Sequence, residues 1–188
     1  MHHLIFEGAE LAGKSWIMSQ VYNHLEPKYR TEKFILDGCL WFNCDNGIFG
    51  TKYSSNYIKN NIKVFQDLKD KNLILEKFHI SDVVYHYLYN DKKLDYELEE
   101  KELERLNFKI IFIKFREDEG LIKKRIKDRL NLYPHYESIL KDVSWYLKQQ
   151  KEYEKEIKKS KLNYFEIETD VLPDYKIIDS ILNFLEER

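Results

Sequence analysis

The residues that most limit how this chain can fold are 8–15, GAELAGKS. They satisfy the pattern G-x-x-x-x-G-K-[ST], in which a tight loop joins a strand to the start of a helix. The flanking residues fit this context, because HLIF at 3–6 is strand-like and the residues from Trp16 onward have helical periodicity. We therefore expect an α/β fold built around this loop, which we call the P-loop.

The residue types in the P-loop suit the binding of a triphosphate. Glycines let the backbone bend so that successive N–H groups can point at phosphate oxygens. Lys14 can reach the β- and γ-phosphates, and the Ser15 hydroxyl can ligate Mg²⁺. The helix that follows adds the partial positive charge of its N-terminus. The sequence therefore predicts binding of ATP and Mg²⁺ by Gly8, Ala9, Glu10, Leu11, Ala12, Gly13, Lys14, Ser15 and Trp16.

Short β-rich runs alternate with longer amphipathic runs along the rest of the chain, as in stacked βαβ units. We expect strands over residues 3–6, 33–37, 72–76, 108–115 and 163–168. We expect helices after Lys14, around 58–65, from about 81, and over 97–106, 121–130, 137–159 and 174–187. The sequence thus predicts a single domain, residues 1–188, with a three-layer α/β/α P-loop fold and a five-stranded parallel sheet.

Charge and composition argue against several other classes of protein. The formal net charge of −2 is unlike that of proteins that bind long nucleic acids, and 43% hydrophobic residues argue against disorder. No apolar run reaches the roughly 18–20 residues of a membrane span, and the chain enters a strand-like run without a leader. Cys39 and Cys44 lack partners at zinc spacing, which favours free thiols. We expect a cytoplasmic protein.

Two carboxylates end predicted strands near the P-loop. Glu76 ends the strand at 72–76, and Asp37 ends the one at 33–37. A P-loop protein needs a strand-end acid beside its Mg²⁺, although either residue could instead cap a turn. Ser15 and Glu76 are our candidate Mg²⁺ ligands. Glu10 and Asp37 are candidates to orient or deprotonate the attacking group.

The helix after the fourth predicted strand carries Arg125 and Arg129, four positions apart and so on one face. Two guanidinium groups held together suit the charge on a phosphoryl group in transfer. Solvated helix charge is the alternative interpretation. Residues 131–135 read as a loop, and we expect a mobile lid around 117–136.

Two segments carry a resemblance to a known family. Residues 6–15, FEGAELAGKS, resemble the thymidylate kinase P-loop, F-E-G-x-[DE]-x-x-G-K-[ST], and residues 76–86, EKFHISDVVYH, resemble its D-R-Y-x-x-S-x-x-A-Y-Q. The related deoxynucleoside kinases have E-R-S at the same strand end, which Glu76 fits better. The resemblance implies that Glu10 faces a nucleotide acceptor. It implies that the acceptor site also includes Lys77, Ser81 and Tyr85.

The segment after the second predicted strand departs from this pattern. Thymidylate kinases have R-E-P-G there and deoxynucleoside kinases have E-P, whereas residues 37–50 contain neither Arg nor Pro. Trp41 and Phe42 in this segment are candidates to stack on a base, with core packing as the alternative. The missing arginine, and Lys77 in place of an arginine, weaken the case for an acceptor that already carries a phosphate.

Three functions remain compatible with these features. The first is an ATP- and Mg²⁺-dependent kinase for a nucleoside or nucleotide, in which Lys14, Arg125 and Arg129 neutralise developing charge. The second is a P-loop kinase for another small molecule or for a nucleic-acid end. The third is an ATP-binding regulator with little turnover; a GTPase switch is disfavoured because the guanine-reading motif N-K-x-D is absent. The identity of the small-molecule acceptor stays open, as does a homodimer.

Overall fold

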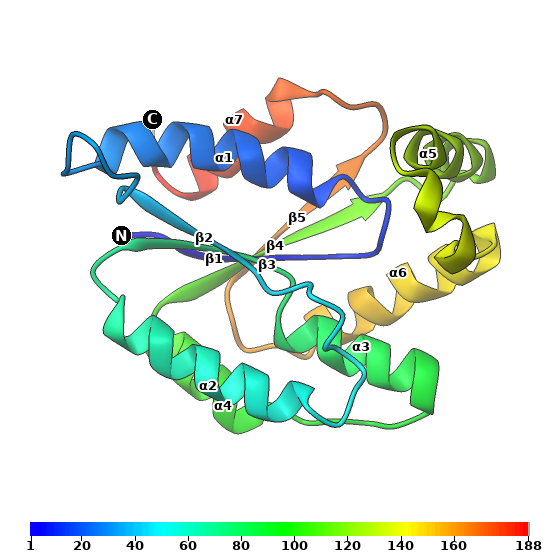
Figure 1. Ribbon diagram of the computed structural model, residues 1–188, viewed down its shortest axis with the longest axis horizontal. Helices are drawn as coiled ribbons and strands as arrows, with labels where there is room; N and C mark the ends of the chain where they lie inside the picture. The colour runs from blue at the N-terminus through cyan, green and yellow to red at the C-terminus, as the bar shows by residue number, and fades with distance from the viewer. Residues whose placement is uncertain (188) are drawn as a thin grey trace.

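The computed structural model describes residues 1–187 and contains a five-stranded sheet in which all neighbouring strands are parallel (Figure 1). The strand order is β2-β3-β1-β4-β5. The strands are β1 (His3–Glu7), β2 (Cys39–Asn43), β3 (Asn72–Glu76), β4 (Phe108–Phe115) and β5 (Tyr164–Thr169). The α/β class and the five parallel strands predicted from the sequence are confirmed.

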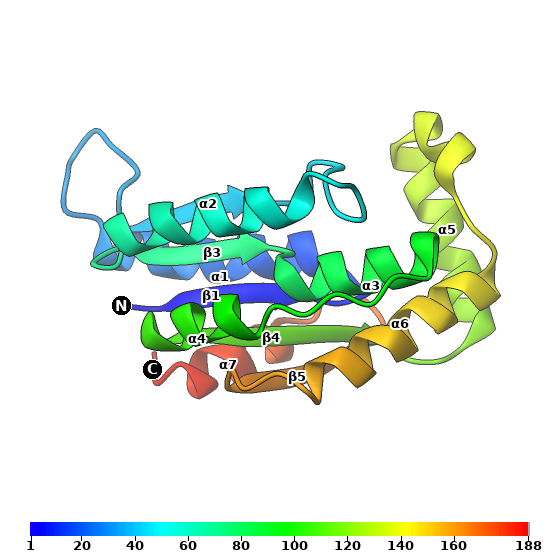
Figure 2. The ribbon, with the colours of Figure 1, turned by 90° about the horizontal axis from the view of Figure 1, so that it is seen from below.

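Helices cover both faces of the sheet (Figures 1 and 2). One face carries α1 (Lys14–Tyr29) and α7 (Tyr175–Phe184). The other carries α2 (Ser54–Asp67), α3 (His79–Asn90), α4 (Glu97–Arg105) and α6 (Val143–Ile157). α5 (Glu119–Leu132) and the short 3₁₀ helix η1 (Pro134–Ile139) lie beyond the carboxyl ends of the strands. Within residues 1–187, no helix has the length and apolar character needed to cross a membrane.

The central strands are continuous apolar runs because helices cover them on both sides. All five residues of β1 are buried, and so are six of the eight residues of β4. Parallel strands buried on both faces carry such runs instead of an alternating pattern. The P-loop follows β1, so it lies at the carboxyl edge of the sheet between β3 and β4.

The second strand lies later in the chain than the sequence predicts. The prediction of a strand over 33–37 is wrong, because β2 spans Cys39–Asn43 and residues 31–37 form a loop. The Asp37 carboxylate closes this loop, accepting a hydrogen bond from Thr31 N–H (3.0 Å) and pairing with Lys71 (3.0 Å). Asp37 therefore precedes β2 and lies at the amino edge of the sheet, opposite the P-loop.

The long helix predicted over 137–159 is shorter than expected. Residues 134–139 form η1, Leu140 has an extended backbone, and α6 begins only at Val143. The start of α6 is set by Asp142, whose carboxylate accepts a hydrogen bond from Trp145 N–H at 2.8 Å. The break separates α6, which packs on α3, from α5 and η1 at the edge of the sheet.

Candidate active site

The P-loop bends where the sequence has glycine. Gly8 has φ of 140° and Gly13 has φ of 89°. A Cβ atom on Gly8 would lie 1.9 Å from the carbonyl oxygen of Ile113 in β4, so this position tolerates only glycine. Leu11, at the apex, adopts φ of 66° without being glycine. A backbone held in this unfavourable region is typical of a ligand-binding loop.

Lys14 lies in the mouth of the P-loop and is 6% exposed. Its Nζ donates to the carbonyl oxygens of Gly8 (2.8 Å) and Ala9 (2.7 Å). Burial, with a smaller effect from the neighbouring Lys77, lowers the pKa of Lys14 to about 8. The loop therefore concentrates one positive charge where a triphosphate would place negative charge.

The lowered pKa of Lys14 predicts pH-dependent ATP binding. Lys14 is charged below about pH 8 and loses its charge as the pH rises through that value. Because a triphosphate attracts the charged form, we expect ATP affinity to fall about tenfold between pH 7 and pH 9. Lys14→Arg is the matched control, since its guanidinium stays charged over this range. Titration calorimetry measures both proteins; the same pH dependence in each would contradict the assignment.

Ser15 and Glu76 lie together although they are far apart in the sequence. Ser15 Oγ donates to Glu76 Oε1 at 2.6 Å, because β3 ends beside β1 and α1 starts at the same edge. Mg²⁺ in phosphate sites takes few protein oxygens and fills its shell with phosphate and water, so this hydroxyl and carboxylate fit it. No cluster of three or more His, Cys, Asp or Glu side chains suited to a metal occurs in residues 1–187, and this kind of site needs none.

On the side of the P-loop that faces β2 and β3, four side chains form a continuous chain of contacts. The Lys77 Nζ lies 2.6 Å from Asp45 Oδ2 and donates to the Tyr85 hydroxyl at 2.9 Å. Tyr85 in turn donates to Glu10 Oε1 at 2.8 Å. Arg129 of α5 approaches the same carboxylate, with Nη1 at 3.7 Å from Glu10 Oε2. We call Asp45, Lys77, Tyr85 and Glu10 the polar chain.

Electrostatics keeps Lys77 and Asp45 of the polar chain ionised. Burial alone would lower the pKa of Lys77, but Tyr85, Asp45 and Glu10 raise it well above its usual range. Burial would raise the pKa of Asp45, yet the charge and hydrogen bond of Lys77 lower it. Lys77 itself has φ of 58°, an uncommon conformation for a lysine, directly after the last residue of β3. The local backbone is held so that this ammonium faces the cavity.

Two side chains from outside the loop hold its apex. Arg125 Nη1 donates to the carbonyl oxygen of Leu11 (2.9 Å), and its Nη2 donates to that of Asp170 (2.6 Å). Gln149 of α6 is fully buried, and its Oε1 accepts a hydrogen bond from Glu10 N–H at 2.8 Å. The positive φ of Leu11 is thus stabilised by α5 and α6, which ties both helices to the P-loop.

A cavity of about 610 Å³ opens at the P-loop and contains much of the predicted site. The predicted residues that line it are Glu10, Leu11, Gly13, Lys14, Ser15, Trp16, Glu76, Lys77, Arg125 and Arg129. Tyr85 contacts two of them through the polar chain. The cavity is also lined by Asp45, by Tyr133 and Tyr136 of the predicted lid, and by Val171 and Leu172 after β5.

Four predicted site residues lie elsewhere. Asp37 is at the opposite edge of the sheet, because it closes the loop before β2 through its contacts with Thr31 and Lys71. Trp41 and Phe42 alternate on β2, so Trp41 packs near Tyr22 of α1 (5.9 Å between ring centroids) and Phe42 near Phe65 of α2 (5.2 Å). Neither ring reaches the cavity. Ser81 is fully buried, and its hydroxyl donates to the carboxylate of Glu7.

Sequence reasoning missed Asp45 and Gln149. Asp45 follows the carboxyl end of the true β2, whose Asn43 pairs with Glu76, and the run LWF at 40–42 was the signal that could have placed that strand. Gln149 lies with Gln150 on the buried face of α6, between Tyr146 and Tyr153. Amides inside an apolar helix stripe indicate a buried polar contact, but not its partner.

Comparison with known proteins finds similarity in structure but not in sequence. A scan against protein-family models finds no match, and a comparison with curated proteins finds none either. YorR from Bacillus subtilis, solved in complex with phosphorylated GDP, aligns with a TM-score of 0.66 at 18% identity, over 97% of this chain and 95% of that one. Deoxyadenosine kinase from M. mycoides with bound dCTP aligns at 0.55 and 19% identity, over 99% and 98%. The chain shares their fold.

Proposed function

We propose that this chain is an ATP- and Mg²⁺-dependent phosphotransferase that acts on a nucleoside or a nucleoside monophosphate. The observation that carries the proposal is the juxtaposition of the P-loop with the polar chain at one cavity. A protein that only binds ATP needs the P-loop alone, whereas a kinase needs a second group of polar side chains beside Lys14 to hold an acceptor. The fold shared with a deoxyadenosine kinase supports a nucleoside-type acceptor.

In this proposal the P-loop holds the phosphate donor. The N–H groups of the loop and the start of α1 bind the β-phosphate, and the Lys14 ammonium turns from the loop carbonyls to the phosphate oxygens. Mg²⁺, held by Ser15 and Glu76, would neutralise charge on the β- and γ-phosphates. Arg129 lies at the cavity wall, where its guanidinium can stabilise the charge of the transferring group.

The polar chain supplies the group that directs the attacking oxygen. The carboxylate of Asp45 is 38% exposed, lines the cavity and is kept ionised by Lys77. It can accept a hydrogen bond from an acceptor hydroxyl and take its proton as that oxygen bonds to the γ-phosphorus of ATP and the bond from this phosphorus to the leaving ADP breaks. Glu10, bound by Tyr85 and near Arg129, can orient the acceptor at a second point.

The charges on this side favour a hydroxyl over a phosphate as the attacking group. Lys77 is already neutralised by Asp45 at 2.6 Å, and Arg129 lies near the carboxylate of Glu10. An acceptor phosphate would have to displace these carboxylates from their cations, whereas a neutral hydroxyl adds no charge. Within the proposed class, the nucleoside is therefore the better fit and the monophosphate the second.

A coupled assay of ADP formation over a panel of nucleosides and nucleoside monophosphates tests this function. We expect at least one nucleoside to raise the rate of ATP consumption well above its basal value, and the matching monophosphate to raise it less. Asp45→Asn should lower the stimulated rate about 10²-fold, as for other positioned acid–base groups. If no member of the panel raises the rate while ATP binds, the nucleoside or nucleotide assignment is wrong.

A further inference from the structure

Two arginines of α5 line the P-loop cavity, but they are held in different ways. Arg125 is fixed by hydrogen bonds to the carbonyl oxygens of Leu11 and Asp170. Within residues 1–187, the Arg129 side chain makes no hydrogen bond, and its one ion pair is with the Glu10 carboxylate at 3.7 Å. The N–H donors of Arg129 are therefore available to a phosphate, but polar contacts do not fix the orientation of its guanidinium group.

The aromatic ring of Tyr136 lies against the guanidinium group of Arg129. The Cζ atom of Arg129 is 4.6 Å from the centre of this ring, and both residues line the cavity. At this distance the negative face of the ring attracts the cation. Stacking on a ring fixes the plane of a guanidinium group and leaves its N–H donors available, whereas a hydrogen-bonding partner would occupy some of them.

Tyr136 is itself held in place by the helix η1, which packs on α5 beyond the carboxyl ends of the strands (Figure 2). Its N–H donates to the carbonyl oxygen of Tyr133 at 3.0 Å, and its own carbonyl oxygen accepts from Leu140 N–H at 3.1 Å. The ring of His135 packs edge-on against the Tyr136 ring, with 4.5 Å between the centroids. Of the residues of η1, only Tyr136 is half-buried and only Tyr136 lines the cavity.

We infer that Tyr136 is a positioning residue for phosphoryl transfer and acts through Arg129. Its ring holds the guanidinium group at the cavity wall, with the N–H donors available to the γ-phosphoryl group. These donors stabilise the negative charge that develops while the bond from the γ-phosphorus to ADP breaks and the bond to the acceptor oxygen forms. The inference rests on the proposed phosphotransferase function and gives η1 a part in it.

Steady-state kinetics with the best nucleoside of the panel test this role. Tyr136→Ala should lower kcat about fivefold, the size of one cation–ring contact, and should change KM for ATP less than about twofold. Tyr136→Phe keeps the ring and should retain nearly the wild-type kcat. In a protein that already carries Arg129→Ala, Tyr136→Ala should cause no further loss, because the ring then has no guanidinium group to hold.

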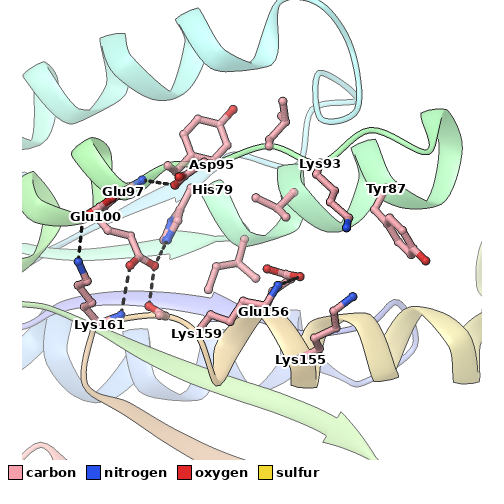
Figure 3. A pocket seen from close by; sticks show the side chains of 15 residues that line it. His79, Tyr87, Lys93, Asp95, Glu97, Glu100, Lys155, Glu156, Lys159 and Lys161 are labelled. Carbon is pink, nitrogen blue, oxygen red and sulfur yellow. Dashed lines mark hydrogen bonds and ion pairs between the residues drawn. The ribbon is translucent and has the colours of Figure 1, made fainter.

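The matched control is Tyr87→Ala. Tyr87 of α3 is also half-buried and also has a cation beside its ring, since the Lys155 Nζ lies 5.1 Å from the ring centre (Figure 3). This pair lies in a separate groove, where Lys155 also pairs with Glu152 at 3.0 Å, and neither Tyr87 nor Lys155 lines the P-loop cavity. The variant should leave kcat nearly unchanged, which separates the loss of a ring at the cavity from the general effect of removing a tyrosine.

A second measurement on the same proteins needs no turnover. In the NMR spectrum of the arginine side-chain Nε–Hε groups, the Tyr136 ring should displace the Arg129 signal, because an aromatic ring shields protons that lie over its face. The spectrum of Arg129→Lys identifies this signal by its absence. Tyr136→Ala should return the signal toward the usual arginine position, and Tyr87→Ala should leave it in place.

An active Tyr136→Ala protein with the wild-type kcat would overturn the inference. The same fold loss from Tyr136→Ala with and without Arg129 would also overturn it, because Tyr136 would then be a structural residue only. Either result would leave the proposed function standing. A protein that binds ATP but phosphorylates no acceptor would overturn the proposed function instead, and an Arg129 signal that does not move in Tyr136→Ala would overturn the contact as well.

Discussion

Replacing Lys14 with alanine is expected to lower phosphoryl transfer by at least ~10²–10³-fold, the size of a single strong electrostatic contribution in an active site. Lys14 is the one P-loop side chain whose charge lies inside the loop, held by the carbonyl oxygens of Gly8 and Ala9. Its loss removes attraction that grows as negative charge shifts between the β- and γ-phosphates. The measurement is kcat and KM for ATP with the best nucleoside of the panel.

The fold should survive the loss of Lys14. The variant leaves two loop carbonyls that water in the cavity can bind, which costs about 1 kcal/mol or less. Lys123→Ala, an exposed lysine of α5 outside the cavity, is the matched control and should leave both kcat and stability nearly unchanged. If a folded Lys14→Ala protein turned over at the wild-type rate, the proposed role of the P-loop in catalysis would be wrong.

The largest expected effect on stability comes from Gly8→Ala. The added Cβ would lie 1.9 Å from the Ile113 carbonyl oxygen, which is backbone of the interior strand β4 and cannot turn aside. The substituted residue would also have to keep φ near 140° or shift the P-loop. We expect a loss of at least ~3 kcal/mol in the free energy of unfolding, as for overpacking combined with backbone strain.

The variant Gly47→Ala separates the cost of the steric clash from the cost of the strained backbone conformation. Gly47 also has a positive φ, 77°, but a Cβ there would meet nothing within 4 Å. This variant should lose only about 1 kcal/mol, the cost of a left-handed conformation. Urea unfolding of the wild type, Gly8→Ala and Gly47→Ala gives the loss in the free energy of unfolding for each variant. If Gly8→Ala unfolds at the same urea concentration as Gly47→Ala, β1 and β4 are not packed as closely at the P-loop as described.

Most of the fold could be predicted because its strands are set by local pattern. The apolar runs at 72–76 and 108–115 are strands, since covering helices make such runs favourable. The second strand could not be placed in this way, because FIL at 34–36 and LWF at 40–42 both have strand propensity. Tertiary contacts decide which of the two segments forms the strand. Asp37 closes the earlier segment as a loop, whereas Cys39–Asn43 pairs with β3.

The candidate site, like the fold, could be predicted from the sequence only in part. The proximity of Glu10, Lys77 and Tyr85 could be expected, because residues after neighbouring parallel strands meet at one edge of the sheet. Asp45 was missed because its strand was misplaced. Contacts made across the fold by Arg125 and Gln149 could not be foreseen, because their partners are backbone groups of the P-loop and sequence pattern carries no signal for them.

In the proposed function, the P-loop and the polar chain act together on one phosphoryl group. The most direct measurement is to follow the label from ATP labelled at its γ-phosphate, with nucleosides and nucleoside monophosphates as acceptors. We expect the wild-type protein to transfer label to an acceptor and the folded Lys14→Ala protein not to do so. Label that stays on ATP or appears only as inorganic phosphate with every acceptor, or equal transfer by both proteins, would contradict it.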